Sequence, residues 1–360
     1  MNIDHLIKKF NNAQESLVIQ QSDFSLETLS RMVINNIVDL NPHYQRRNRW
    51  TVDKQSKLIE SFILNVPVPP IYFSEDEYGV YSVIDGKQRL TSIHDFLFDA
   101  YKLKNLEVFS ELNGLTYSEL PNQIKHALSI RPYIRIVTLL KQSDPHLKYE
   151  VFLRLNTGGD ALKAQEIRNV AFDGSLNALL YELSSNEILK QKLKITDDSS
   201  NAFRKMEDLE MILRFFALLK FWDNLPNQNI SKVLDIYMQE NRNPNRSEIQ
   251  HLRDLFNNSI QICDELLQGN AFYKPTSQTI FREQLIAPLY DAQLIAVAIL
   301  INEGHLNQLR QIDQTKLRIR LYDLFQNNEQ FIKSVTQATN NASNVNTRIR
   351  TMYDLLNSLL

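Results

Sequence analysis

Strand-forming segments cluster in the first part of this chain, and this asymmetry limits the folds available to it. Two of them, "PPIYFSE" (69–75) and "VYSVI" (80–84), flank the turn "DEYG" and predict a β-hairpin. A third, "PYIRIVTLL" (132–140), alternates and is rich in β-branched residues. Beyond them the apolar residues recur at helical spacing. The sequence therefore predicts an α+β domain over residues 1–160, followed by an all-α helical domain over residues 161–360.

The predicted helices fall into two groups, one on each side of this boundary. The first group covers residues 25–36, 51–65, 118–128 and 143–156. The second group has long amphipathic segments at 204–222, 246–267 and 281–303, and a last helix at 346–360. Residues 336–348 read as a polar loop before that last helix.

Composition excludes several classes of protein. Hydrophobic residues make up 43% of the chain, which is typical of a globular protein. The net charge is only −2, so any nucleic-acid site must be a local cluster of basic residues. The single cysteine, Cys263, excludes a disulfide framework and a cysteine-based zinc site. No apolar run approaches about 18 residues, and no charged-then-apolar leader opens the chain. We therefore expect a cytoplasmic protein with no membrane partner.

The segment "VYSVIDGKQRLTSIHDF" (80–96) predicts a strand, a glycine turn and a helix that opens at Lys87. A helix N-terminus carries a partial positive charge, so cations such as Lys87 and Arg89 cost about 0.3–1 kcal/mol there. An anion held by the helix amides and both side chains would remove this conflict. The alternative interpretation is that both side chains are simply solvated.

The two residues before the predicted helix refine this interpretation. Gly86 allows a positive φ or a close approach of another group to the backbone. Asp85 would repel a neighbouring phosphate unless a divalent cation, a ribose hydroxyl or an attacking water lay between them. The alternative for Asp85 is a turn residue in an Asp-Gly pair.

"DGKQRLTSI" (85–93) resembles the DGQQR motif of the N-terminal domain of GmrSD-type modification-dependent restriction enzymes, with Lys87 in place of the more usual glutamine. The block at 42–73, which contains Tyr44 and Arg46, is similar to the family's upstream block. "VFLRLNTGGDALKAQEIRN" (151–169) is similar to its block F-x-x-L/I-N-x-x-G-x-x-L-x-x-x-E-I-R. The ending at 331–350 is also similar, so the resemblance covers most of the chain.

This resemblance implies a ParB/sulfiredoxin-like nucleotide-binding domain, whose relatives bind nucleotides at an equivalent Gly-x-x-Arg turn. It implies an NTP-binding and Mg²⁺-dependent NTP-hydrolysing protein of a bacterial restriction or anti-phage defence system, with ATP, GTP and CTP all open. Asp85 and Gln88 are the expected catalytic residues: Asp85 holds the metal or activates water, and Gln88 orients phosphate or water. The residues expected to bind the nucleotide are Gly86, Lys87, Arg89, Arg46, Tyr44 and Asn156.

The resemblance also bears on partners. GmrSD-type enzymes pair this domain with an HNH nuclease, but the seven histidines here are scattered and show no H–N–H spacing in the C-terminal half. A separate HNH-type nuclease subunit is therefore the implied partner. Two other functions stay open: a DNA-binding adaptor without turnover that uses Arg46, Arg47 and Arg49, and a weak ParB-like nuclease at the DGKQR site itself. The oligomeric state also stays open.

Overall fold

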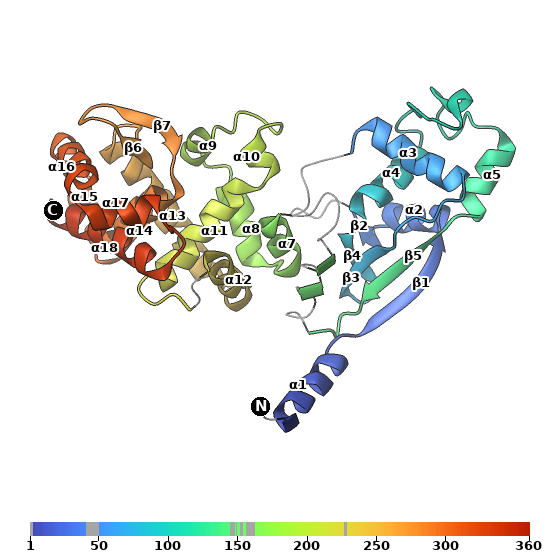
Figure 1. Cartoon of the computed structure of the whole chain (residues 1–360), viewed down its shortest axis with the longest axis horizontal. Helices are drawn as coiled ribbons and strands as arrows, with labels where there is room; N and C mark the ends of the chain where they lie inside the picture. The colour runs from blue at the N-terminus through green and yellow to red at the C-terminus, as the bar shows by residue number, and fades with distance from the viewer. Residues whose placement is uncertain are drawn as a thin grey trace. The chain divides into compact units, whose positions relative to one another are not determined.

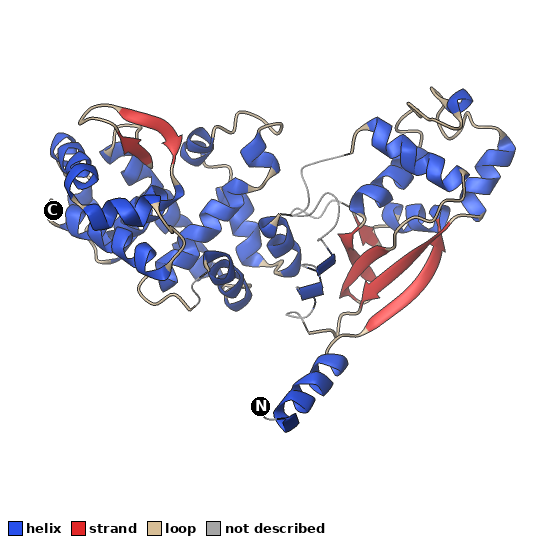
Figure 2. Ribbon diagram, in the orientation of Figure 1, coloured by secondary structure: helices blue, strands red, loops and turns tan. Residues whose placement is uncertain are grey.

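The computed structural model describes residues 3–40, 50–144, 148, 150–151, 154–155, 163–226 and 229–360. The chain divides into two compact units, Met1–Ala171 and Phe172–Leu360. Helix α7 (Ala164–Ala171) belongs to the first unit, so the observed division lies later than residue 160. The first unit mixes helices and strands, whereas the second is mostly helical (Figure 2). Within the described residues, no helix combines the length and apolarity needed to span a bilayer.

A five-stranded mixed sheet in the order β1-β5-β3-β4-β2 forms the first unit (Figure 1). The strands are β1 (Ile19–Ser25), β2 (Val38–Asp39), β3 (Ile71–Glu77), β4 (Val80–Asp85) and β5 (Tyr133–Leu139). Strand β3 runs antiparallel to β4 and parallel to β5. The predicted hairpin and the predicted strand over 132–140 are therefore confirmed.

Helices cover one side of this sheet (Figure 1). They are α2 (Leu26–Ile34), α3 (Val52–Ile63), α4 (Lys87–Leu97) and α5 (Asn122–Ile130). In β5, Ile134 and Ile136 are buried and alternate with exposed neighbours, as expected when one sheet face is covered. They join one apolar core with Phe62 of α3 and Phe96 of α4. This core fixes the position of α4 against the sheet.

Local chemistry explains where the helices of the first unit begin. Helix α2 begins after Ser25, whose hydroxyl accepts the backbone N–H of Thr28, as an N-cap does. Helix α5 begins at Asn122 and not at residue 118, because Pro121 disfavours a helical conformation in the residue before it. Helix α1 (Ile3–Glu15) and strand β1 are additional elements that the sequence patterns did not predict.

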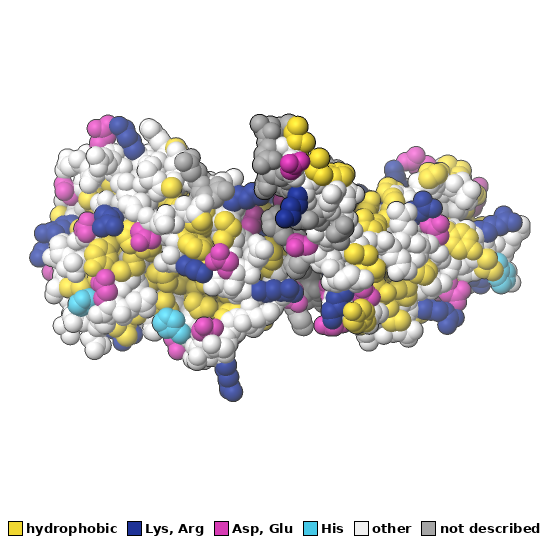
Figure 3. All heavy atoms as spheres, turned by 90° about the horizontal axis from the view of Figure 1, so that it is seen from below, with side chains coloured by type: hydrophobic (Ala, Val, Ile, Leu, Met, Phe, Trp, Pro, Cys, Tyr) yellow, Lys and Arg dark blue, Asp and Glu magenta, His cyan; other side chains and the backbone are white. Residues whose placement is uncertain are grey.

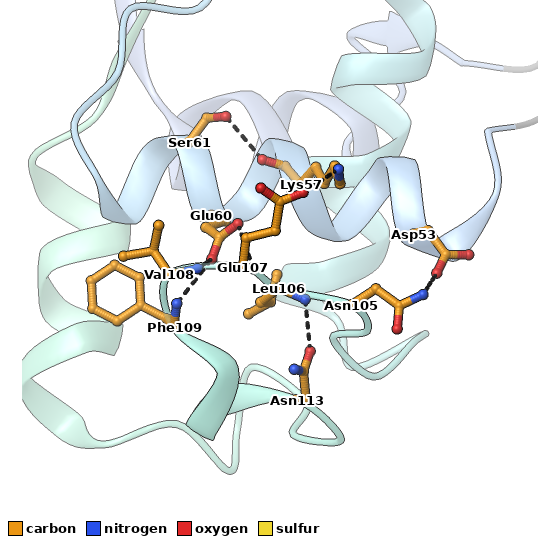
Figure 4. Close-up of polar contacts among 10 residues, drawn as sticks. All are labelled: Asp53, Lys57, Glu60, Ser61, Asn105, Leu106, Glu107, Val108, Phe109 and Asn113. Atoms are coloured by element: carbon orange, nitrogen blue, oxygen red, sulfur yellow. Dashed lines mark hydrogen bonds and ion pairs between the residues drawn. The ribbon is translucent and has the colours of Figure 1, made fainter.

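A buried carboxylate ties α3 to the loop that follows α4 (Figure 4). The side chain of Glu60 accepts backbone N–H groups of Val108 at 2.8 Å, Phe109 at 3.0 Å and Glu107 at 3.3 Å. Burial alone would raise the pKa of Glu60, but these three hydrogen bonds outweigh it and lower the pKa. Lys57, one turn earlier on α3, also pairs with Glu107 at 2.7 Å. The loop, with its 3₁₀ turn Ser110–Leu112, is thereby fixed to α3.

The second unit contains eleven described helices and one short β-hairpin. The helices are α8 (Ser175–Leu183), α9 (Glu187–Leu193), α10 (Asn201–Arg204), α11 (Glu207–Phe221), α12 (Ile230–Glu240), α13 (Arg246–Leu266), α14 (Ala287–Asn302), α15 (Leu306–Leu309), α16 (Gln314–Asn327), α17 (Glu329–Thr336) and α18 (Ala342–Asn357). Helix α14 is buried along most of its length and packs against α11, α13, α17 and α18. It therefore forms the centre of this unit.

The prediction of helices throughout the second half was wrong over residues 273–285. Strands β6 (Tyr273–Pro275) and β7 (Phe281–Leu285) form an antiparallel hairpin there, and α14 begins only at Ala287. A five-residue apolar-polar segment cannot be assigned by periodicity alone. Pro288, in the first turn of α14, marks the true helix start. The polar loop is also shorter than expected, because α18 begins at Ala342.

A buried charge cluster joins three helices of the second unit. Asp291 of α14 is 1% exposed and receives two hydrogen bonds from Arg214 of α11, at 2.6 and 2.7 Å. It also accepts a hydrogen bond from Arg348 of α18, which is fully buried. Burial alone would raise the pKa of Asp291, but the two guanidinium groups lower it overall. We call Asp291, Arg214 and Arg348 the buried triad.

Candidate functional site

The DGKQR motif lies where strand β4 ends and helix α4 begins. Asp85 is the last residue of β4, Gly86 occupies the N-cap position, and Lys87 is the first residue of α4. Leu90, Ile93 and Phe96 of α4 are completely buried, which fixes the helix on the sheet. The predicted strand, turn and helix are therefore confirmed, and the polar residues of the motif lie together at the start of α4.

Gly86 combines a left-handed backbone conformation with close packing that leaves no room for a side chain. Its φ of +93° lies in the left-handed region, where a side chain is strained. A Cβ at this position would also lie 2.8 Å from Cγ1 of Ile71 in the neighbouring strand β3. The same Cβ would lie 3.0 Å from Nη2 of Arg89. The glycine therefore lets the Arg89 guanidinium lie directly against the turn.

Arg89 is held in place by two partners. Its Nη2 donates to Oδ2 of Asp85 at 2.6 Å, and its Nη1 donates to the backbone carbonyl of Pro69 at 3.0 Å. The Arg89 side chain is 12% exposed and that of Asp85 is 38% exposed. Asp85 thus supplies a negative charge beside the helix start, where carboxylates are favourable, and it neutralises Arg89. The ion pair with Asp85 therefore offsets the unfavourable placement of the Arg89 cation at a helix N-terminus.

Gln88 connects α4 to the segment that leads into α3. It is 8% exposed, and its Oε1 accepts the backbone N–H of Trp50 at 3.1 Å. Its own backbone carbonyl accepts a hydrogen bond from the hydroxyl of Ser92 at 2.6 Å. The amide oxygen of Gln88 therefore has a structural partner, whatever further contacts its side chain makes.

Backbone amides complete this site. The first turn of an α-helix has N–H groups without intrahelical acceptors, and Gly86 provides no side-chain cap for them in α4. Lys87, at the first position of the helix, is half-buried and takes part in other interactions. The arrangement combines outward amides with Arg89, and this combination suits a phosphate or carboxylate ligand.

Three of the predicted nucleotide-binding residues, Tyr44, Arg46 and Asn156, lie outside the described residues. Arg47 and Arg49, on which the DNA-binding alternative also depends, lie outside them as well. Side chains of opposite charge are interspersed on the molecular face seen in Figure 3. Of the predicted site, the structure describes Asp85, Gly86, Lys87, Gln88 and Arg89, which lie together where β4 ends and α4 begins.

The carboxylates near the motif limit what kind of metal site it can form. Among the described residues, no group of three or more His, Cys, Asp or Glu side chains is placed to hold a metal ion. Mg²⁺ commonly takes one or two protein carboxylates and fills its other positions with phosphate oxygens and waters. Asp85 could supply one such carboxylate, with the other ligands coming from the phosphates and waters of a bound ligand. It does not fit a metal site made of protein ligands alone.

The "QEIRN" block forms helix α7, and its polar side chains are buried. Glu166 accepts the backbone N–H of Lys163 at 2.7 Å, so it caps the start of its own helix. Arg168 is 1% exposed and donates to Gln165 at 3.2 Å. These contacts give the block a local structural role in the first unit.

Sequence reasoning missed two contacts that build the site. The backbone carbonyl of Pro69 accepts a hydrogen bond from Arg89, and the backbone N–H of Trp50 donates one to Gln88. Both partners use backbone atoms, which carry no residue-type signal. The Asp85–Arg89 pair joins two charges of opposite sign that lie four residues apart, although Asp85 ends strand β4 and precedes the helix, so helical spacing alone does not predict the pair.

Comparison with known proteins finds one family match. No curated protein and no solved structure matches the chain. Residues 26–172 match the family model described as GmrSD restriction endonuclease, N-terminal domain. The match runs from the start of α2 to the residue after α7, and it includes the whole DGKQR motif. Residues 26–172, all but the last of which lie in the first unit, therefore form a region similar to the GmrSD restriction endonuclease N-terminal domain.

Proposed function

We propose that this protein is a nucleotide-binding component of a bacterial DNA restriction or anti-phage system. The family of residues 26–172 supports the role in restriction. The observation that carries nucleotide binding is the left-handed Gly86 turn, which begins α4 without a side-chain cap and places the first turn of the helix beside an arginine held by Asp85 and Pro69. We also propose a ParB/sulfiredoxin-like fold for the first unit, in keeping with its mixed sheet and glycine turn.

In this proposal the residues of the motif divide the work of binding a nucleoside triphosphate. The backbone amides of α4, together with Lys87 and Arg89, hold phosphate oxygens, and Gln88 orients a phosphate or a water. Tyr44, Arg46 and Asn156 complete the cradle. A Mg²⁺ ion bound with the phosphates would neutralise charge and activate water for hydrolysis. Asp85 would contact that ion or the water.

Replacing Arg89 by alanine should weaken nucleotide binding by about 1.5–3 kcal/mol, the scale of a hydrogen bond to a charged group. Because Arg89 also pairs with Asp85, the variant should lose some stability too, in contrast to a solvated arginine. Calorimetric titration with ATP, GTP and CTP, with and without Mg²⁺, measures the affinity of both proteins.

A matched control is Arg135→Ala, which breaks the exposed ion pair between Arg135 and Asp23 at the edge of the same sheet. That variant should bind nucleotide as the wild type does. Equal nucleotide affinity in Arg89→Ala and the wild type would refute the phosphate role of Arg89.

We propose that the DNA-cutting residues lie in a separate HNH-type nuclease subunit. Phosphodiester cleavage needs a metal-activated nucleophile and stabilisation of the leaving oxygen. The histidines show no H–N–H spacing in the C-terminal half, and in this proposal Asp85 serves the nucleotide site, where it pairs with Arg89. The helical unit offers long helices for docking such a partner.

The purified chain alone should therefore leave DNA uncut in the presence of Mg²⁺ and NTP, whereas a complex with an HNH-type partner should cut only when NTP is present. Gel assays of plasmid cleavage measure both reactions. Efficient Mg²⁺-dependent cutting by the single chain, lost in Asp85→Ala, would instead establish the weak-nuclease alternative.

A further inference from the structure

We infer that Asp85 determines which form of the nucleotide the site accepts, so that it binds the metal complex of a nucleoside triphosphate and discriminates against the bare anion. This inference rests on the proposed function, because it concerns the ligand of the same site. It assigns Asp85 a role in specificity that is separate from any part in hydrolysis. The geometry of the Asp85–Arg89 pair carries it.

The first step is that Arg89 already has hydrogen-bond partners within the protein. Arg89 donates to Asp85 at 2.6 Å and to the carbonyl of Pro69 at 3.0 Å, and little of it is exposed. Its guanidinium also lies against Gly86, so backbone atoms restrict it on the side of the turn. A phosphate that takes a hydrogen bond from Nη2 must therefore displace the Asp85 carboxylate or share the guanidinium with it.

The second step concerns charge. Asp85 and Arg89 form a neutral pair, so a bare triphosphate finds no net positive charge from these two residues. Asp85 lies directly before Gly86, and its carboxylate remains beside the phosphate after the displacement. Like charges within a few ångströms repel strongly at a partly buried site. The displaced carboxylate therefore opposes every anion that arrives without a counter-ion.

The third step is that a divalent cation removes this repulsion. The carboxylate released by Arg89 becomes available to a Mg²⁺ ion that already carries phosphate oxygens, which suits the coordination of that ion. Asp85 is 38% exposed, so its second partner has access from solvent. Asp85 thus weakens binding of the bare nucleotide and strengthens binding of the metal complex. The preference arises because Asp85 exchanges Arg89 for the metal ion as its partner.

Calorimetric titration tests this inference with ATP, GTP and CTP, each in excess Mg²⁺ and in EDTA. The wild type should bind the Mg²⁺ form about tenfold or more tightly than the bare form, the scale on which one neighbouring charge shifts an ionisation equilibrium. In Asp85→Asn, the affinity for the bare form should rise by a similar factor. The ratio of the two affinities should then fall close to one.

Two further variants keep the test decisive. Asp23→Asn removes the carboxylate of a comparable Asp–Arg pair in the same unit and should leave the ratio unchanged. Arg89→Gln keeps Asp85, so it should lower both affinities while the preference for the Mg²⁺ form persists. Circular dichroism of each variant confirms that the fold is retained.

The outcomes separate the inference from the proposed function. Nucleotide binding with the same Mg²⁺ preference in Asp85→Asn and the wild type would overturn the inference and leave the proposed function intact. A loss of the preference in Arg89→Gln would also overturn it, because the preference would then belong to the arginine. No binding of any nucleotide, by the wild type or by Asp85→Asn, would overturn both.

Discussion

Replacing Asp291 by alanine should lower the free energy of unfolding by about 3–5 kcal/mol, the cost of removing one partner from a buried ion pair. The substitution leaves Arg348 fully buried and Arg214 nearly so, both without their shared carboxylate. It also removes the ion pairs that join α14 to α11 and to α18 at the centre of the second unit. Urea denaturation followed by circular dichroism measures the loss.

The same substitution should change the response to acid. Because the pKa of Asp291 is lowered in the folded chain, its contribution is complete above the ordinary aspartate range and is lost as the pH falls below it. The difference in stability between wild type and variant should therefore shrink in strong acid. Glu329→Ala, which breaks an exposed pair with Lys333, is the control and should have a much smaller effect. A similar loss in both variants would contradict the importance of the buried triad.

Replacing Gly86 by alanine should abolish nucleotide binding in the measurable range and cost about 1–3 kcal/mol of stability, the usual cost of a strained backbone position. The added Cβ would lie 2.8 Å from Ile71 and 3.0 Å from the Arg89 guanidinium, so Arg89 must leave its present place. The hydrogen bonds from Arg89 to Pro69 and Asp85 would then be disrupted. Calorimetric titration and urea denaturation measure the two effects separately.

Gly79→Ala is the matched control for this prediction. Gly79 also has a positive φ, +77°, but open space surrounds the position of its Cβ. It lies in the turn between β3 and β4, so both glycines are in the same hairpin-to-helix segment. This control should lose stability through backbone strain alone and bind nucleotide normally. If Gly79→Ala lost binding as Gly86→Ala does, strain and not the close approach of Arg89 would explain the defect.

Local patterns predicted those parts of the fold that local forces decide. The hairpin of β3 and β4 follows from alternation and a turn, and α4 follows from apolar spacing that buries Leu90 and Ile93. Strand β1 was not predicted, because its sequence IQQSDFS is mostly polar and exposed, and only its pairing with the distant strand β5 makes it a strand. Strand β7 was merged with the following helix, because its few residues do not define a period.

The site shows the same division between local and long-range causes. The motif residues lie together because they are adjacent in sequence, so this part was predictable. The contacts of Arg89 with Pro69 and of Gln88 with Trp50 join segments that the fold brings together through backbone atoms. Likewise, Arg214 of α11 is buried against Asp291 of α14. Its carboxylate partner lies on another helix, and helical periodicity carries no signal for that pairing.

The strand order of the first unit has a consequence for how the chain folds during synthesis. Strand β1 pairs with β5, from Ile19 opposite Leu139 to Ser25 opposite Tyr133. A nascent chain that ends before residue 133 therefore contains β1 but not β5, the strand with which β1 pairs in the folded sheet. Contacts this distant in sequence form late and slow the folding of a domain. Until the ribosome has released β5, the hydrogen-bonding groups of β1 remain open to other chains, which makes this interval the vulnerable stage of biogenesis.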